Sequence, residues 1–212
     1  MTLSQLVTAV RTQLGDLAAG SARWSDEDLE AALTRAVDEF SLQLPRKMKT
    51  VLVATPTSRD LDITSLSRLI AITAVEWKTG EYPPSYNPFS LWGNTLTINV
   101  KNAPTAADNV NIFWYGMHQL DPAGSTMEPW AEHLVITGAT GYAAEQAAAQ
   151  NMGAVSVAGP KSADQWRLFG RQQLQLFRNA LHRHGISGRL QTSTLYVPAD
   201  TPVGDQSHDR GP

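Results

Sequence analysis

Trp24-Ser25-Asp26-Glu27-Asp28-Leu29 decides the fold of this 212-residue chain, because it marks the start of a helix. Ser25 and Asp28 form a capping-box pattern, in which the serine hydroxyl accepts a free backbone N–H and the acid bonds back to the cap. Trp24 before the cap and Leu29 inside the helix match a hydrophobic staple. The acids of the first turn also suit the positive end of the helix dipole.

Apolar side chains then recur at helical spacing until Pro45, which ends the pattern. They are Leu29, Leu33, Ala36, Val37, Phe40 and Leu44. A second apolar stripe lies upstream and stops at Gly15. Its members are Leu3, Leu6, Val7, Val10 and Leu14. Two amphipathic helices joined by a short polar loop are predicted to pack antiparallel as a hairpin.

After Pro45 the pattern changes from a period of 3.6 to a period of 2. Residues 70–77 form the strongest strand signal, residues 110–115 form another, and Gly93-Asn94 between two β-rich runs is typical of a hairpin. Polar turns separate about five or six short strands within residues 50–116. We expect an antiparallel sheet or a small sandwich.

A helical pattern returns after this β-rich region. Pro129 suits a first helical turn, and residues 130–152 are rich in alanine. Gly138 and Gly141 lie inside this run, where each glycine costs about 1 kcal/mol of helix stability. The pair therefore indicates that a neighbouring helix or subunit approaches closely.

The last predicted helix begins with another capping box, Ser162 with Gln165, and ends at Gly185. Residues 186–212 are rich in Gly, Ser, Thr and Pro and are expected to be extended or disordered in the free chain. Four apolar residues of this tail are candidates for docking to a partner. They are Leu190, Leu195, Tyr196 and Val197.

The order of these elements predicts an α+β protein with helices at both ends of the chain. Residues 1–46 and 123–185 are expected to pair as two helical hairpins in a four-helix bundle. Residues 47–122 are expected to form an inserted antiparallel β domain, and residues 186–212 an extended tail.

The composition narrows the function classes. The formal charge of −3 argues against a protein whose whole surface grips nucleic acid, and the absence of cysteine excludes disulfides and thiolate metal sites. The charge is uneven, since residues 61–160 carry three basic and eight acidic side chains and residues 161–212 carry seven and four. No signal peptide and no run of about 20 apolar residues is present, so we expect a protein that works in the cytoplasm or in a particle assembled there.

No catalytic pattern emerges from the sequence. His182 and His184 are two residues apart at a helix end, whereas helical metal pairs need a spacing of three or four. The sequence has no nucleophile elbow, P-loop, dinucleotide fingerprint or HExxH motif. We predict no catalytic residue, metal, cofactor or small-molecule substrate.

One polar feature of the last helix is a candidate site. Arg167, Arg171, Arg178 and His182 fall on one side of the helical wheel and form a basic stripe. The stripe is either a solvated face or a contact with an acidic protein surface or DNA phosphates.

The sequence resembles the head-to-tail connector, or adaptor, proteins of tailed bacteriophages. The resemblance rests on residues 14–16, the cap at 24–29 and its helix to Pro45, with residues 62–67, 75–77, 115–120, 138–139 and 142–144 matching versions that carry a β insertion. It covers most of residues 1–185.

The resemblance implies a virion protein of the phage neck, assembled in the host cytoplasm. Such proteins form a twelve-subunit ring that docks on the portal protein, meets the next neck or tail protein and encloses the genomic DNA. The alternatives are a stopper or other neck or tail-completion protein, a DNA-binding regulatory module that uses the basic stripe, and an enzyme for which no residue can be named.

Overall fold

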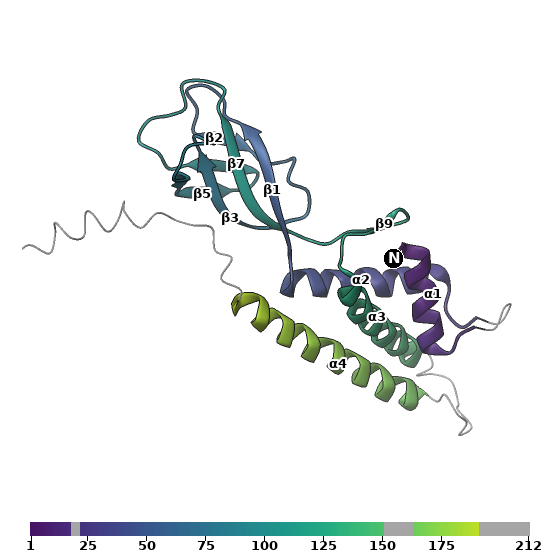
Figure 1. Cartoon of the computed structure of the whole chain (residues 1–212). Helices are drawn as coiled ribbons and strands as arrows, with labels where there is room; N and C mark the ends of the chain where they lie inside the picture. Colours follow the sequence, from purple (N-terminus) through teal and green to yellow (C-terminus); the bar gives the residue numbers. More distant parts are fainter. Residues whose placement is uncertain (18–21, 151–162, 191–212) are drawn as a thin grey trace, which may run out of the picture. The chain divides into compact units, whose positions relative to one another are not determined.

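The computed structural model describes residues 1–17, 22–150 and 163–190, with the backbone alone for residues 186–190. They form two compact units (Figure 1). The helical unit contains residues 1–46 and the described residues from 117 on, and the β unit contains residues 47–116. Residues 117–122, expected in the β domain, belong to the helical unit, where His118 bonds to Ser41 of the second helix and to Leu44 just after it. The α+β class is confirmed, with four helices and antiparallel sheets in the described ranges.

The first two helices have clear sequence signals at their ends. Helix α1 (Leu3–Leu14) begins at a capping box of Thr2 with Gln5 and ends at Gly15, whose φ of 65° lies in the left-handed region. Helix α2 (Asp26–Gln43) begins at Ser25, whose hydroxyl oxygen accepts the Asp28 N–H at 3.1 Å. These caps satisfy backbone N–H groups that have no partner within the helix.

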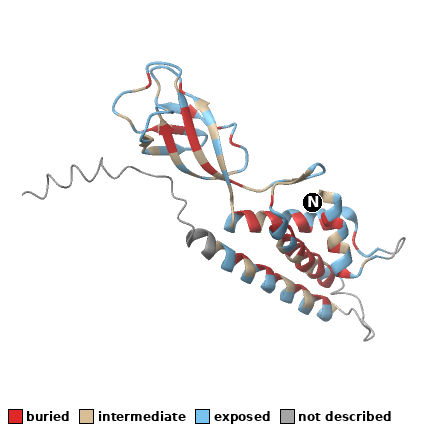
Figure 2. Cartoon of the chain, viewed as in Figure 1, coloured by how far each residue is buried: buried red, intermediate tan, exposed pale blue. Residues whose placement is uncertain are grey.

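Helix α3 (Pro129–Gln150) is the central helix of this unit. It packs against α1, α2 and α4 (Ala163–Leu190), most extensively against α4. Figure 2 shows α3 buried along most of its length, whereas α4 has a buried side and an exposed outer side. Trp24, directly before the α2 cap, anchors to α3 by donating its indole N–H to the Ala143 carbonyl at 3.0 Å. The four helices contribute to one hydrophobic cluster.

Three glycines allow α3 and α4 to approach closely. A Cβ built on Gly138 lies 2.9 Å from the Phe177 ring, and one on Gly141 lies 2.7 Å from Leu174 Cγ. A Cβ built on Gly170 of α4 lies 2.9 Å from the carbonyl oxygen of Gly141. Real Cβ atoms do not approach that closely, so the helix crossing depends on the missing side chains.

The structure corrects the end of the last helix. Helix α4 continues five residues beyond Gly185 to Leu190. Gly185 is not among the residues with positive φ, which is the conformation that ends α1 at Gly15. The tail expected from residue 186 therefore begins in helix, and residues 191–212 lie outside the described ranges.

Where the chain re-enters the helical unit, His118 fixes it to the end of α2. The His118 backbone N–H donates to the buried Ser41 hydroxyl at 3.0 Å, and its Nε2 lies 3.1 Å from the Leu44 carbonyl oxygen. Its Nδ1 lies 3.3 Å from the Thr126 hydroxyl. A short pair of strands follows, β8 (Leu120–Asp121) with β9 (Gly124–Ser125).

The β unit contains seven strands in two sheets. One sheet has the order β1-β7-β3-β4 and the other has the order β2-β6-β5. The strands are β1 (Arg46–Val53), β2 (Asp60–Asp62), β3 (Leu69–Trp77), β4 (Tyr86–Asn87), β5 (Phe89–Trp92), β6 (Thr95–Ile98) and β7 (Asn109–Gly116). Strands β3 and β7 pair antiparallel, with Val75 opposite Ile112. Gly93-Asn94 joins β5 to β6 as the predicted hairpin, since Trp92 pairs with Thr95.

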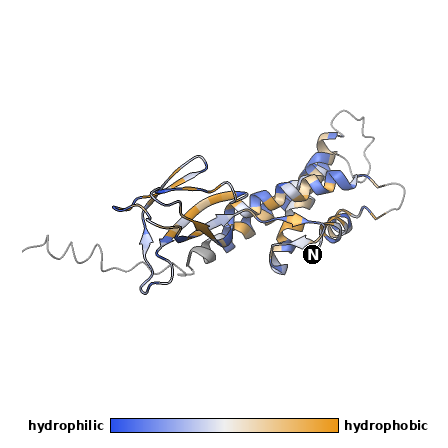
Figure 3. Cartoon of the chain, turned by 90° about the horizontal axis from the view of Figure 1, so that it is seen from above, coloured by the Kyte–Doolittle hydropathy of each residue, from blue (hydrophilic) through white to orange (hydrophobic). Residues whose placement is uncertain are grey.

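Both sheets contribute to one core in the β unit. Its fully buried members include Val75, Leu96, Ile98, Val110 and Ile112. Figure 3 shows the hydrophobic residues of this unit concentrated on its long strands. A buried polar pair joins β7 to β3, where the Asn111 amide donates to Glu76 Oε2 at 2.8 Å. This pairing satisfies polar groups that would otherwise be costly to bury.

Candidate interaction surface on the helical unit

The predicted basic stripe lies on one exposed side of α4, but its arginines have different surroundings. Arg178 Nε donates to Glu39 Oε1 of α2 at 2.7 Å. The other Glu39 oxygen accepts a short hydrogen bond from the Tyr142 hydroxyl of α3. This triad joins α2, α3 and α4 through charge-assisted hydrogen bonds.

Contacts within this triad shift the pKa values of Glu39 and Tyr142. Partial burial alone acts to raise the pKa of Glu39, but the hydrogen bonds from Arg178 and Tyr142 outweigh it and hold that pKa below its usual value. Burial and the neighbouring Glu39 raise the pKa of Tyr142. The stable arrangement at neutral pH is therefore an ionised Glu39 beside a neutral Tyr142.

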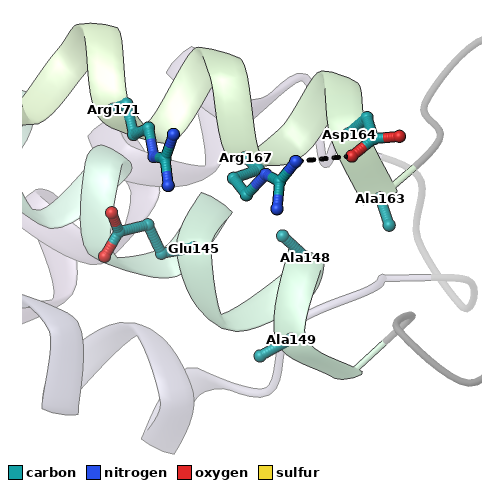
Figure 4. Close-up of a pocket in the computed structure, with 7 residues that line it drawn as sticks. All are labelled: Glu145, Ala148, Ala149, Ala163, Asp164, Arg167 and Arg171. Carbon is teal, nitrogen blue, oxygen red and sulfur yellow. Dashed lines mark hydrogen bonds and ion pairs between the residues drawn. The ribbon is translucent and has the colours of Figure 1, made fainter.

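The other members of the stripe make fewer contacts. Arg167 pairs with Asp164 on its own helix at 3.0 Å, and both side chains are largely exposed. Arg171 makes no hydrogen bond or ion pair with any residue that the structure describes. Figure 4 shows Arg167 and Arg171 reaching from α4 over α3, with Glu145 of α3 below Arg171. His182 is exposed at the far end of the stripe.

A charged groove runs along this side of α4, between α4 and α2, with α3 as its floor. It consists of four shallow hollows of about 250, 270, 270 and 390 Å³ that share lining residues. Glu145 borders three hollows, while Arg171 and Arg178 each border two. The groove is lined by Arg35 and Glu39 of α2, by Tyr142, Glu145 and Ala148 of α3, and by Asp164, Arg167, Arg171 and Arg178 of α4. Its open form suits a protein surface better than an enclosed small molecule.

Large apolar side chains are exposed on both units. On the outer face of α4, Leu168 and Leu176 are 71% and 52% exposed. On the β unit, Tyr82 and Trp92 are 94% and 88% exposed. The sequence pattern placed Leu176 on the apolar arc of the last helix, but the structure exposes it, and no local signal predicted that Trp92, directly before the Gly93-Asn94 hairpin turn, would be exposed. Aromatic side chains such as those of Tyr82 and Trp92 are enriched at protein interfaces, whereas single exposed leucines are also common on protein surfaces.

The remaining candidate residues divide into those that the structure places and those outside its described ranges. Trp24, Ser25 and Asp28 form the start of α2, and Gly138 and Gly141 lie at the crossing of α3 with α4. Gln165 lies in the first turn of α4, whereas its expected partner Ser162 lies outside the described residues. Leu195, Tyr196 and Val197 also lie outside them, and Leu190 is described only as the last residue of α4.

The described residues contain no group of three or more His, Asp or Glu side chains that could hold a metal ion. Within the same ranges, no helix combines the length and the apolar character that a membrane crossing requires.

Comparison with known proteins gives one family. The model of the SU10 adaptor protein family matches residues 1–199, so the match spans both units. No curated protein matches the sequence. A chain from a solved structure entitled "Virion of native gene transfer agent (GTA) particle" shares 15% identity, with 81% of this chain and 88% of that chain covered and a TM-score of 0.30.

Proposed function

The chain belongs to the SU10 adaptor protein family of phage head-tail adaptors, and we propose that it forms a ring of twelve subunits in the phage neck. The ring docks on the portal protein and continues the DNA channel toward the tail. The observation that carries this proposal is the family match over residues 1–199, which includes the β unit as well as all four described helices. The family is a structural one and not a class of enzymes.

The surface of the protein supports a role in assembly. A ring subunit needs contacts with two copies of itself and with the components above and below it. The charged groove, the exposed leucines of α4 and the exposed Trp92 of the β unit offer several separate contact surfaces. A protein whose partners cover such residues has a physical reason to display them.

The basic stripe and the tail are the proposed partner contacts. Arg167, Arg171, Arg178 and His182 meet an acidic protein surface or the phosphates of DNA in the channel. Leu190, Leu195, Tyr196 and Val197 dock on the portal or on the next neck protein. Assembly takes place in the host cytoplasm, before the particle is released.

Electron microscopy of purified particles tests the ring. We expect this chain as twelve copies in contact with the portal, and a particle that lacks the chain would contradict the proposal. Pull-downs with the portal and with tail proteins separate an adaptor, which binds the portal directly, from a stopper, which does not.

Removing residues 191–212 tests the role of the tail. The helical and β units should keep their thermal unfolding transitions, because residues 191–212 are mostly polar and their removal takes away few apolar side chains. Binding to the portal should fall. A truncated chain that unfolds, or that binds the portal as well as the full chain does, would contradict docking by the tail.

A further inference from the structure

The charged groove carries a surplus of positive charge that its own side chains do not neutralise. Its lining contains four arginines and three carboxylates, and Arg171 has no ion-pair partner among the described residues. The guanidinium of Arg35 stacks on the Tyr142 ring, 4.1 Å from its centroid. Such a groove suits an occupant with a few carboxylates rather than a neutral one.

Small side chains line part of the α2 wall of the groove and part of its floor. Ala31 and Ala32 border it on α2, while Ala148 and Ala149 border it on α3. The hollows extend from Ala163 to His182 along α4, which corresponds to about 28 Å at the helical rise per residue. These dimensions suit a ridge of a helix, because small residues allow two helices to approach closely.

A ridge of matching charge exists on the same molecule. Glu27, Glu30 and Thr34 are exposed on one side of α2, at the three- and four-residue spacing of a single helical face. Neither glutamate has a hydrogen bond or ion pair with any described residue. Asp26 and Asp28, by contrast, bond to Arg11 and Gln146.

The ridge and the groove lie mainly on different sides of α2. At 100° per residue, the ridge is centred about 140° around α2 from Ala32, Arg35 and Glu39, which border the groove, and Ala31 at the edge of the groove lies between them. One copy therefore offers its ridge and its groove to two different neighbours at once. A contact of this kind is heterologous, and its repetition closes a ring when the rotation between copies is suitable.

We propose that the charged groove of one copy receives the Glu27–Glu30–Thr34 ridge of the next copy. The carboxylates of the ridge approach Arg171 and Arg35, and Leu168 on the adjacent outer face of α4 lies beside the contact. The inference rests on the proposed ring, since ring closure supplies the second copy. DNA is the less suitable occupant because Asp164, Glu39 and Glu145 alternate with the arginines and would repel phosphates.

Charge reversal in the full-length chain tests the contact. We expect R171E to weaken self-association in low salt by about tenfold or more, as sedimentation equilibrium measures, and E27R/E30R to do the same. R171Q, which only removes the charge, should have a smaller effect of the same sign. K101E changes the charge by the same amount on an exposed residue of the β unit and should associate like the original chain.

Mixing the variants gives the decisive result. Alternating copies of R171E and E27R/E30R pair a reversed groove with a reversed ridge and an original groove with an original ridge, so an equal mixture should recover self-association. The proposal is overturned if the mixture does not recover, if R171E associates like K101E, or if the original chain stays monomeric at its highest soluble concentration. It is also overturned if R171E lowers affinity for duplex DNA while self-association is unchanged.

The same variants separate this inference from the ring itself. Particles made with R171E, K101E or the original chain can be examined by electron microscopy. A normal ring with R171E refutes the groove contact and leaves the proposed function intact. The absence of a ring with the original chain refutes the proposed function.

Discussion

The helical unit and the β unit are built by opposite packing strategies. In the helical unit, glycine and alanine allow α3 and α4 to cross with their backbones close together, as at Gly141 and Gly170. In the β unit, branched side chains such as Val75 and Ile112 fill the space between two sheets. The crossing of α3 and α4 therefore tolerates almost no added side-chain volume. The core of the β unit, in contrast, depends on the volume of the large side chains that fill it. Each unit has a separate core, so damage to one should leave the other folded.

The largest expected effect is a side chain added at the helix crossing. Gly170→Leu places a Cβ within 2.9 Å of the Gly141 carbonyl oxygen, which is backbone and cannot rotate away. We expect a loss of about 3 kcal/mol or more in the helical unit, which is a large part of the roughly 5–15 kcal/mol that stabilises a typical domain. Thermal unfolding followed by circular dichroism measures the loss, and NMR of the β unit shows whether that unit remains folded.

Gln172→Leu is the matched control for this substitution. It adds a leucine two residues away on the exposed face of the same helix. Gln172→Leu should change the free energy of unfolding by no more than about 0.5 kcal/mol. If both leucines cost the same, the close approach of the helices is not what stabilises the crossing.

The next largest loss of stability is expected from a cavity made in the β unit. Ile112→Ala removes a fully buried side chain opposite Val75 and should cost the β unit about 2–4 kcal/mol. The thermal unfolding transition of the helical unit should not shift. Val53→Ala, on an exposed residue of β1, should change little. A common shift of both transitions would show that the two units unfold together and that their cores are not independent.

Removing a buried hydroxyl should destabilise the protein less than either core substitution does. Ser41→Ala leaves the His118 N–H without its acceptor, and an unsatisfied buried donor costs about 1–3 kcal/mol. Thr8→Ala is a suitable control, since the Thr8 hydroxyl makes the same bond to the carbonyl four residues earlier but on an exposed face. Equal unfolding free energies for the two variants would mean that the His118 contact is not structural.

The two units also differ in how much of them the sequence could predict. The end of α1 and the start of α2 could be predicted because Ser25, Asp28 and Gly15 act on residues within a few positions of themselves. The Gly93-Asn94 hairpin could be predicted for the same reason. The strand order β1-β7-β3-β4 could not be predicted, because it depends on pairing between strands far apart in the chain.

The candidate surface shows the same limit. The helical wheel placed Arg167, Arg171 and Arg178 on one side of α4, since that placement depends on spacing alone. The pairing of Arg178 with Glu39, 139 residues away, has no local signal. Neither the groove around Arg171 nor its lack of an ion-pair partner among the described residues has a local signal, because both depend on how α2 and α4 pack on α3.

The smallest expected effect is a pH dependence confined to the helical unit. Burial lowers the pKa of His118, an effect that nearby Arg46 adds to and that the hydrogen bonds with Leu44 and Thr126 partly offset. The unfolded chain then binds a proton at a higher pH than the folded chain does. The contribution of His118 to stability is therefore complete above about pH 6.5, where both states are neutral, and falls as the pH drops toward the lower folded pKa. His118→Gln should flatten this part of the stability curve of the helical unit, while the β unit, which has no histidine, should show no such slope in either protein. A slope that survives the substitution would have to be assigned to another group, and His118 would then be no more than a packing residue.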